Sequence, residues 1–306
     1  MVYKIIHGVC ETELRKLQKL NDLGEVHLTF MNPPFSQHND FARQNGSVAT
    51  ERYWKWMKRI CEKVFALTGS GGALYFLHNE ANSEILLKTL RRTGWTFQNL
   101  IIWNKLNSAS QITNHFENQY QIIAFATKGE APRVFNHLRI DLQLSQLHKT
   151  ENGIDVSDVW HDVGGLTTNF LMNSGTSSSE SDVIITKEGR LFHLHQIPIN
   201  LLIRIILASS LPGDLILDPF AGAGITTMVA EKLDRNSISI EYDSQNVQVI
   251  KRRILLQRRA IKIPEISDYY RHTNRLKTLL PVSGKASISS NIVNSLGTFL
   301  VKRKNP

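Results

Sequence analysis

The stretch 215–241 constrains the fold of this chain more than any other part of the sequence. Three apolar residues begin it and lead into a turn that carries Gly222 and Gly224. A run with helical spacing follows over 226–233, and a second short apolar run over 237–240 comes after it. A strand, a glycine turn, a helix and another strand form a βαβ unit, whose strands lie parallel in one sheet with the helix packed on it. The pattern therefore predicts an α/β fold.

The same turn carries groups that a nucleoside-containing ligand would need. Gly222 and Gly224 allow the backbone to turn tightly and to approach a ligand closely. Glu241 ends the second strand, 19 residues after Gly222, where a carboxylate can accept hydrogen bonds from both hydroxyls of a ribose. Asp218 ends the first strand and can orient the loop or bind an ammonium group. Thr227 stands where a dinucleotide site would have a third glycine, so a ligand without phosphates fits better; a tight turn that binds nothing is the alternative.

The first 130 residues repeat the alternation of strands and helices. The expected strands cover 26–31, 73–77, 97–103 and 120–126, and the expected helices cover 5–20, 51–67 and 82–92. We therefore predict a doubly wound, mostly parallel sheet with helices on both faces. Periodicity fades between 132 and 189, and the pattern weakens again after 260.

Composition restricts the partners and the compartment. Of the 306 residues 42% are hydrophobic, and no apolar run reaches the roughly 18 residues that a membrane span needs. Two cysteines give no disulfide framework and favour a reducing compartment. The net charge is +9, and the segment 251–306 carries thirteen basic residues against two acids, a net +11. This asymmetry favours a polyanionic partner, nucleic acid first, over a merely solvated helix and a frayed end.

The tetrapeptide Asn32-Pro33-Pro34-Phe35 ends the apolar run 26–31. Two consecutive prolines cannot continue a central strand, so a rigid turn follows it. Phe35 offers a face on which a flat group can stack, and the polar residue before the prolines can meet an amine on that group. Taken alone, the tetrapeptide also fits a strand-ending turn with a buried phenylalanine.

Together the two stretches resemble the signatures of one family. The sequence Asp218-Pro219-Phe220-Ala221-Gly222-Ala223-Gly224 is similar to the S-adenosylmethionine motif of amino-methylating DNA methyltransferases, and Asn32-Pro33-Pro34-Phe35 is similar to their catalytic motif. Upstream, His193 and Pro198 match the segment that this family places before its cofactor motif. The order, with the catalytic motif first, is that of the beta class of the family.

The resemblance implies a fold, a cofactor and site residues. The fold is the Rossmann-like fold of S-adenosylmethionine-dependent methyltransferases, with an irregular target-recognition insertion. The residues implied to bind S-adenosylmethionine are His193, Pro198, Asp218, Pro219, Phe220, Ala221, Gly222, Gly224, Thr226 and Glu241. The implied catalytic residues are Asn32, Pro33, Pro34 and Phe35, with the Asn32 side chain and the Pro33 carbonyl accepting hydrogen bonds from the target amine. No metal site is expected.

Further residues are candidates for contacts with the DNA substrate. Trp103 ends an expected strand that lies near the Asn32–Phe35 tetrapeptide in the family layout, and it could form a wall of the base pocket, although core packing fits it as well. Arg43 lies in the segment 36–50, a loop that the resemblance places over the flipped base or the cofactor. The basic helix expected over 247–260 could contact phosphates through Lys251, Arg252, Arg253, Arg258 and Arg259.

The predicted function is methylation of the exocyclic amino group of adenine at a specific DNA sequence. In this family, enzymes with Asn before Pro-Pro mostly methylate adenine, and enzymes with Ser there mostly methylate cytosine. Asn32 therefore favours adenine as the target base. The target amine is inaccessible in a stacked duplex, which implies that the base is flipped out. Two alternatives stay open: the same chemistry on cytosine, and an inactive recognition subunit that binds the cofactor. Leu194 and Ile197, which depart from the family pattern, motivate the second alternative.

The resemblance also predicts an organisation and a setting. The expected regions are 1–113 for the catalytic half, 114–190 for target recognition, 191–260 for the cofactor-binding half and 261–306 for a basic tail. The expected partners are double-stranded DNA and a cognate restriction endonuclease, with the chain a monomer or a homodimer and no membrane involved. The expected location is the cytoplasm of a bacterium or archaeon, or of a cell that carries a phage.

Overall fold

One ten-stranded sheet runs through the protein. The structure, a computed structural model, describes residues 2–20, 24–34, 46–104, 118–141, 152–163, 197–256, 261–281, 293–295 and 298–302. The strands of the sheet stand in the order β11-β12-β1-β10-β9-β2-β3-β5-β4-β8. The bounds are β1 Val2–His7, β2 Val26–Met31, β3 Thr68–His78, β4 Thr96–Asn104, β5 Tyr120–Thr127, β8 Val159–Trp160, β9 Leu215–Asp218, β10 Asn236–Glu241, β11 Val293–Ser295 and β12 Thr298–Lys302. The strands β6 Arg139–Ile140 and β7 Ile154–Asp155 pair separately.

Strand directions confirm the predicted fold class. The five central strands β1, β10, β9, β2 and β3 pair in parallel, whereas β5 runs antiparallel between β3 and β4. Parallel strands must be covered on both faces, and β2, β9 and β10 at the centre are accordingly almost continuously buried. The result is a doubly wound, mostly parallel α/β sheet, as the sequence predicts.

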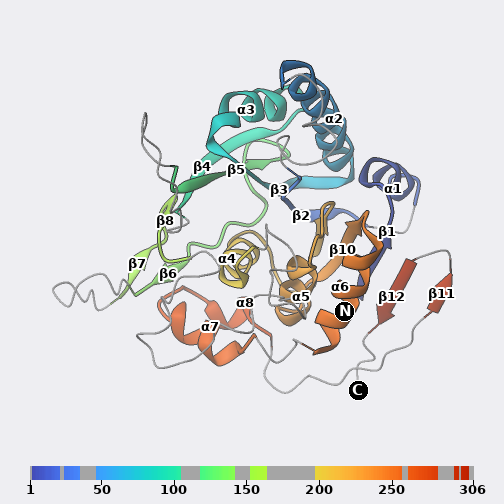
Figure 1. The fold of residues 1–306 in the computed structure, drawn as a ribbon. Coiled ribbons are helices and arrows are strands. Elements are labelled where there is room, and N and C mark those ends of the chain that lie inside the picture. Colours follow the sequence, from blue (N-terminus) through green and yellow to red (C-terminus); the bar gives the residue numbers. More distant parts are fainter. Residues whose placement is uncertain are drawn as a thin grey trace.

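Helices cover both faces of the sheet (Figure 1). One face carries α1 Cys10–Leu17, α2 Gly46–Leu67 and α3 Ser83–Arg92, which pack into one apolar cluster, and the short helix η1 Glu80–Asn82 precedes α3. The other face carries α4 Ile199–Ser209, α5 Ile225–Lys232, α7 Ile263–Tyr269 and α8 Leu276–Leu279. Helix α6 Ser244–Leu256 packs in a smaller cluster with β1. Helix α4 is buried on nearly all sides, as its mostly apolar sequence requires.

The N-terminal segment differs from its predicted structure. The sequence suggested a helix over 5–20, but residues Val2–His7 form β1 and only Cys10–Leu17 are helical. Strand β1 pairs in parallel with β10, with Ile5 opposite Ser239. A partner more than 200 residues away decides this structure, and local spacing carries no sign of it.

The segment after residue 260 is not simply a basic tail. Helices α7 and α8 bury Ile266, Tyr270 and Leu279 in the same apolar cluster as α4 and α5. Strand β12 continues the sheet by pairing antiparallel with β1. The sequence also predicts disorder over 283–290, and those residues lie outside the described part of the chain. Within the described part of the chain, no helix combines the length and the apolarity that crossing a membrane requires.

Candidate active site

The two stretches singled out in the sequence leave neighbouring strands at the same edge of the sheet. Strands β2 and β9 pair in parallel, with Leu28 opposite Ile216 and Thr29 opposite Leu217. Asp218 directly follows Leu217, and Asn32 comes three residues after Thr29. The glycine turn and the Asn-Pro-Pro sequence therefore begin side by side at the carboxyl edge, which is where open α/β sheets place their ligands.

The turn after β2 presents a polar side chain on a rigid support. Asn32 is partly buried, Pro33 is buried and Pro34 is exposed. The prolines fix two backbone angles and supply no N–H groups, so the turn can offer carbonyl and amide oxygens with little rearrangement. Phe35 and Arg43 lie outside the described residues.

Hydrogen bonds within the glycine turn hold it against the end of β10. The Gly222 N–H donates to Glu241 Oε2 at 2.7 Å, and the Gly224 N–H donates to the Ala221 carbonyl at 2.7 Å. Gly222 and Gly224 have φ angles of +50° and +76°, a left-handed region that strains residues with a side chain. A Cβ on Gly224 would also lie 2.7 Å from Ile250 Cγ2, so α6 packs directly on the turn.

Two carboxylates stand at the ends of adjacent strands without a basic partner. Asp218 is buried and accepts the Phe220 N–H at 3.0 Å, so it orients the loop. Burial raises the pKa of Asp218 to about 7, and the nearby Glu241 adds to the rise, while Thr226 and the Phe220 N–H oppose it. Glu241 is partly buried and also accepts the Asp243 N–H at 2.8 Å. Within the described part of the chain neither carboxylate forms an ion pair, so the pair suits a ligand with an ammonium group and ribose hydroxyls.

Other predicted cofactor residues lie around this turn. Pro219 and Thr226 are buried beside Asp218, and Phe220 packs its ring edge-on against Trp56 of α2, with centroids 5.7 Å apart. Pro198 is the N-cap of α4, directly before its first residue. Ile197 is buried in the core, so the departure from the family pattern at this position serves packing. His193 and Leu194 lie outside the described residues.

The predicted DNA-contacting residues divide into two groups. Trp103 is 2% exposed, and its indole N–H donates to the Val163 carbonyl at 2.6 Å, so the structure favours core packing over a base contact. On α6, Lys251 is partly exposed and Arg252 is exposed. Arg253 is a correction to the expected phosphate contacts: it is 2% exposed and donates to the Ala223 carbonyl in the glycine turn at 3.2 Å. Arg258 and Arg259 lie outside the described residues.

Sequence reasoning missed some residues close to these stretches. His78 ends β3, and extending the register in which Met31 faces Phe76 places it beside Pro33. It is fully buried, with its Nε2 3.1 Å from the Tyr53 hydroxyl, and burial lowers its pKa to about 4. Tyr242 directly follows Glu241 and is 73% exposed. In the sequence, His78 directly follows an apolar run and Tyr242 directly follows Glu241. These two positions are the signals that could have indicated both residues.

Comparisons with known proteins agree with this geometry. A family model described as DNA methylase, covering N6 and N4 methyltransferases, matches residues 26–252. Type II methyltransferase M1.MboII of Moraxella bovis is 25% identical over 271 residues, which cover 77% of this chain and 94% of the relative. DNA adenine methyltransferase YhdJ of Escherichia coli strain K12 is 27% identical over 250 residues, 82% of each chain. The structure of an M1.HpyAVI–SAM complex superposes with a TM-score of 0.56 at 19% identity, over 82% of this chain and 98% of that one.

The structural likeness shows the shared fold, and the family model spans both stretches together with the sheet that joins them. Strand β2 before the Asn32 turn, strand β9 before the glycine turn and the acid at the end of β10 all fall within the matched residues. This chain therefore belongs to the N6/N4 family of DNA methylases.

Proposed function

We propose that this chain transfers the methyl group of S-adenosylmethionine to the exocyclic amino group of adenine in a specific DNA sequence. The observation that carries the proposal is the pairing of β2 with β9, which starts the Asn32 turn and the Asp218 turn side by side. The adenine preference rests on Asn32 and agrees with the relative named as an adenine methyltransferase. Cytosine is the second candidate, because the matching family covers N4 methylation as well.

The residues around the glycine turn suit the cofactor. Asp218 would face its ammonium group, Glu241 its ribose hydroxyls, and the exposed ring of Tyr242 its adenine. The Gly222 and Gly224 backbone would allow close approach. When bound, S-adenosylmethionine supplies an electrophilic sulfonium methyl group.

The Asn32 turn would prepare the target nitrogen. An exocyclic amine is a weak nucleophile because its lone pair is delocalised into the ring. The Asn32 side-chain oxygen and the Pro33 carbonyl would accept one hydrogen bond each from the amine, which favours a pyramidal nitrogen and localises the lone pair. With its lone pair localised, the nitrogen would be oriented toward the methyl group that the bound cofactor would supply. A rigid proline turn keeps both acceptors preorganised, so proximity and orientation supply much of the rate.

The proposed activity also assigns DNA-contacting roles to other parts of the chain and implies a second protein component. The residues 114–190 would include the target-recognition region, and the exposed Arg252 on α6 would contact DNA phosphates. A cognate restriction endonuclease is the expected second component, because the relatives include type II methyltransferases.

The test uses the purified chain with radiolabelled cofactor, duplex DNA and mass spectrometry of the digested nucleosides. We expect methyladenine, and Asn32→Ala should reduce transfer at least about a hundredfold while cofactor binding is retained. Asn274→Ala, which changes an exposed asparagine outside both turns and outside 114–190, is the matched control. Methylcytosine without methyladenine would establish the cytosine candidate instead, and normal transfer by Asn32→Ala would refute the role given to this residue.

A further inference from the structure

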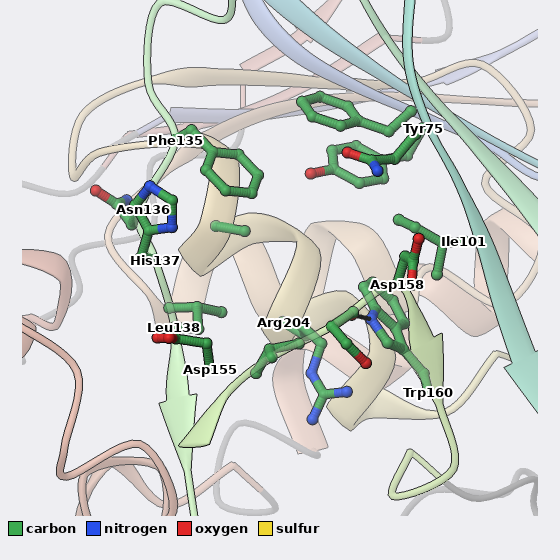
Figure 2. Close-up of a pocket in the computed structure, with 15 residues that line it drawn as sticks. Tyr75, Ile101, Phe135, Asn136, His137, Leu138, Asp155, Asp158, Trp160 and Arg204 are labelled. Atoms are coloured by element: carbon green, nitrogen blue, oxygen red, sulfur yellow. Dashed lines mark hydrogen bonds between the residues drawn. The ribbon is translucent and has the colours of Figure 1, made fainter. Parts of the chain in front are cut away.

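A cavity lies on the face of the sheet that carries α4, and it is separate from the site above. Its volume is about 340 Å³, within the range of small-molecule sites. Its walls come from β3, β4 and β5, from the end of α4, and from the segments 135–138 and 155–160 (Figure 2). None of the residues of the Asn32 turn or the glycine turn lines it.

Stacked aromatic rings form one side of this cavity. The Tyr75 and Phe125 rings lie 4.7 Å apart at 12°, and the Phe125 and Phe135 rings lie 5.9 Å apart at 19°. Phe135 is 45% exposed, so the outer end of the stack is only partly covered, with the His137 ring 5.2 Å away and nearly perpendicular to it. Figure 2 shows Phe135 and Tyr75 on one side of the cavity, with Arg204 and Trp160 on the opposite side. Such a wall suits a flat or apolar ligand body.

Most hydrogen-bond donors in the wall are already paired within the protein; the exposed side chains of Asn99 and His137 are the exceptions in the described part of the chain. Among the described residues the wall holds one arginine, Arg204, and its guanidinium is neutralised by a bidentate ion pair. The pairs are Arg204 with Asp162, the Trp160 indole with the Ser157 carbonyl, the Asn136 amide NH₂ with the Leu207 carbonyl, and the Tyr75 hydroxyl with Ser209. These bonds leave the cavity few donors to offer to an anion.

The groups that remain are mainly acceptors. Asp158 and Asp155 are exposed at the wall; Asp155 has a long ion pair with Arg139 at 3.5 Å, and Asp158 has none within the described part of the chain. The Asn136 NH₂ group donates to the Leu207 carbonyl near the end of α4, so the Asn136 side-chain oxygen can still accept a hydrogen bond from a ligand. Carboxylates beside aromatic faces attract cations and repel DNA phosphates. We propose that this cavity binds a small organic cation, an amidinium, guanidinium or ammonium group on a flat apolar body.

Three probes that share one ring and differ in charge test the proposal. Benzamidine is a cation at neutral pH, benzamide is neutral and benzoate is an anion. Binding to the full chain is measured by calorimetry and by ligand-observed NMR. We expect benzamidine to bind about three- to tenfold more tightly than benzamide, and benzoate to bind most weakly.

Two variants then locate the binding. Asp158→Asn should remove most of the preference for benzamidine over benzamide, whereas Phe135→Ala should weaken both compounds. Glu130→Gln, which changes an exposed acid outside the cavity, is the matched control and should change nothing. The proposal is overturned if the three probes bind alike, if benzoate binds best, or if Asp158→Asn retains the full preference. Because no step depends on methyl transfer, the result is independent of the proposed activity.

Discussion

The buried ion pair between Arg204 and Asp162 should contribute a large coupling energy to folding. Arg204 on α4 is 1% exposed, with its guanidinium 5.1 Å from the centre of the Trp160 ring, and it bonds Asp162 in a bidentate manner, one contact being 2.9 Å. Tyr269 of α7 donates to the same carboxylate. Burial works against the charged form of Asp162, but Arg204 and the Tyr269 hydroxyl hold its pKa below the ordinary value. The pair therefore ties the segment before residue 164 to both α4 and α7.

A double-mutant cycle measures this coupling. Asp162→Ala leaves a buried guanidinium without its partner and should cost about 3–5 kcal/mol. Arg204→Met keeps the volume and leaves a carboxylate whose side chain is 15% exposed and still bonded to Tyr269, so it should cost less, about 2–3 kcal/mol. The double variant should cost about as much as the worse single change, which gives a coupling of about 2–3 kcal/mol.

The assay is urea unfolding followed by fluorescence and circular dichroism. The surface pair Arg271–Asp141, whose side chains are 61% and 37% exposed, provides a matched cycle. We expect less than about 1 kcal/mol of coupling there, because solvent screens the charges. A coupling for Arg204 and Asp162 no larger than that of the surface pair would refute the reasoning.

Two further predictions concern the active-site region. Gly224→Ala should destabilise the chain by about 2 kcal/mol more than Gly129→Ala in thermal unfolding: both positions have positive φ, but only at Gly224 would the new Cβ meet a neighbour, Ile250. Equal losses would mean that Ile250 moves aside. Between pH 4 and the ordinary pKa of 6.5, unfolded His78 binds a proton that folded His78 does not. The free energy of unfolding should therefore fall by about 3 kcal/mol as pH drops through that window. The His78→Gln variant should not show this pH-dependent loss. Parallel pH profiles of wild type and variant would contradict it.

The sequence predicts the core of the site because its signals are local. The residues Gly222 and Gly224 mark a turn by their backbone freedom, and Pro33 and Pro34 end a strand wherever they occur. Apolar runs between such marks predict a parallel sheet, and βαβ topology then brings the two turns to one edge. In the structure, β2 and β9 pair in parallel, and this pairing brings the two turns together at one edge.

What the sequence did not predict depends on distant contacts. Ile5 and Ile6 were assigned to a helix, because only the β10 partner shows that they belong to a strand. Arg253 was placed toward DNA on charge alone, yet its position on α6 turns it into the protein. The Arg204–Asp162 pair joins residues 42 apart across a stretch without periodicity, so no local pattern reveals it.

The pairing of β1 with β12 has a consequence for how the halves of the chain are ordered. Val2 stands opposite Lys302 in this antiparallel pair, so the first and last strands that the structure describes meet at one place in the sheet. A short linker from Lys302 to Val2 could close the chain into a circle. Opening that circle between Val163 and Ile197 would give a circular permutant in which the cofactor motif precedes the catalytic motif. The sheet would be unchanged, so motif order records where the chain was cut rather than how the site is built.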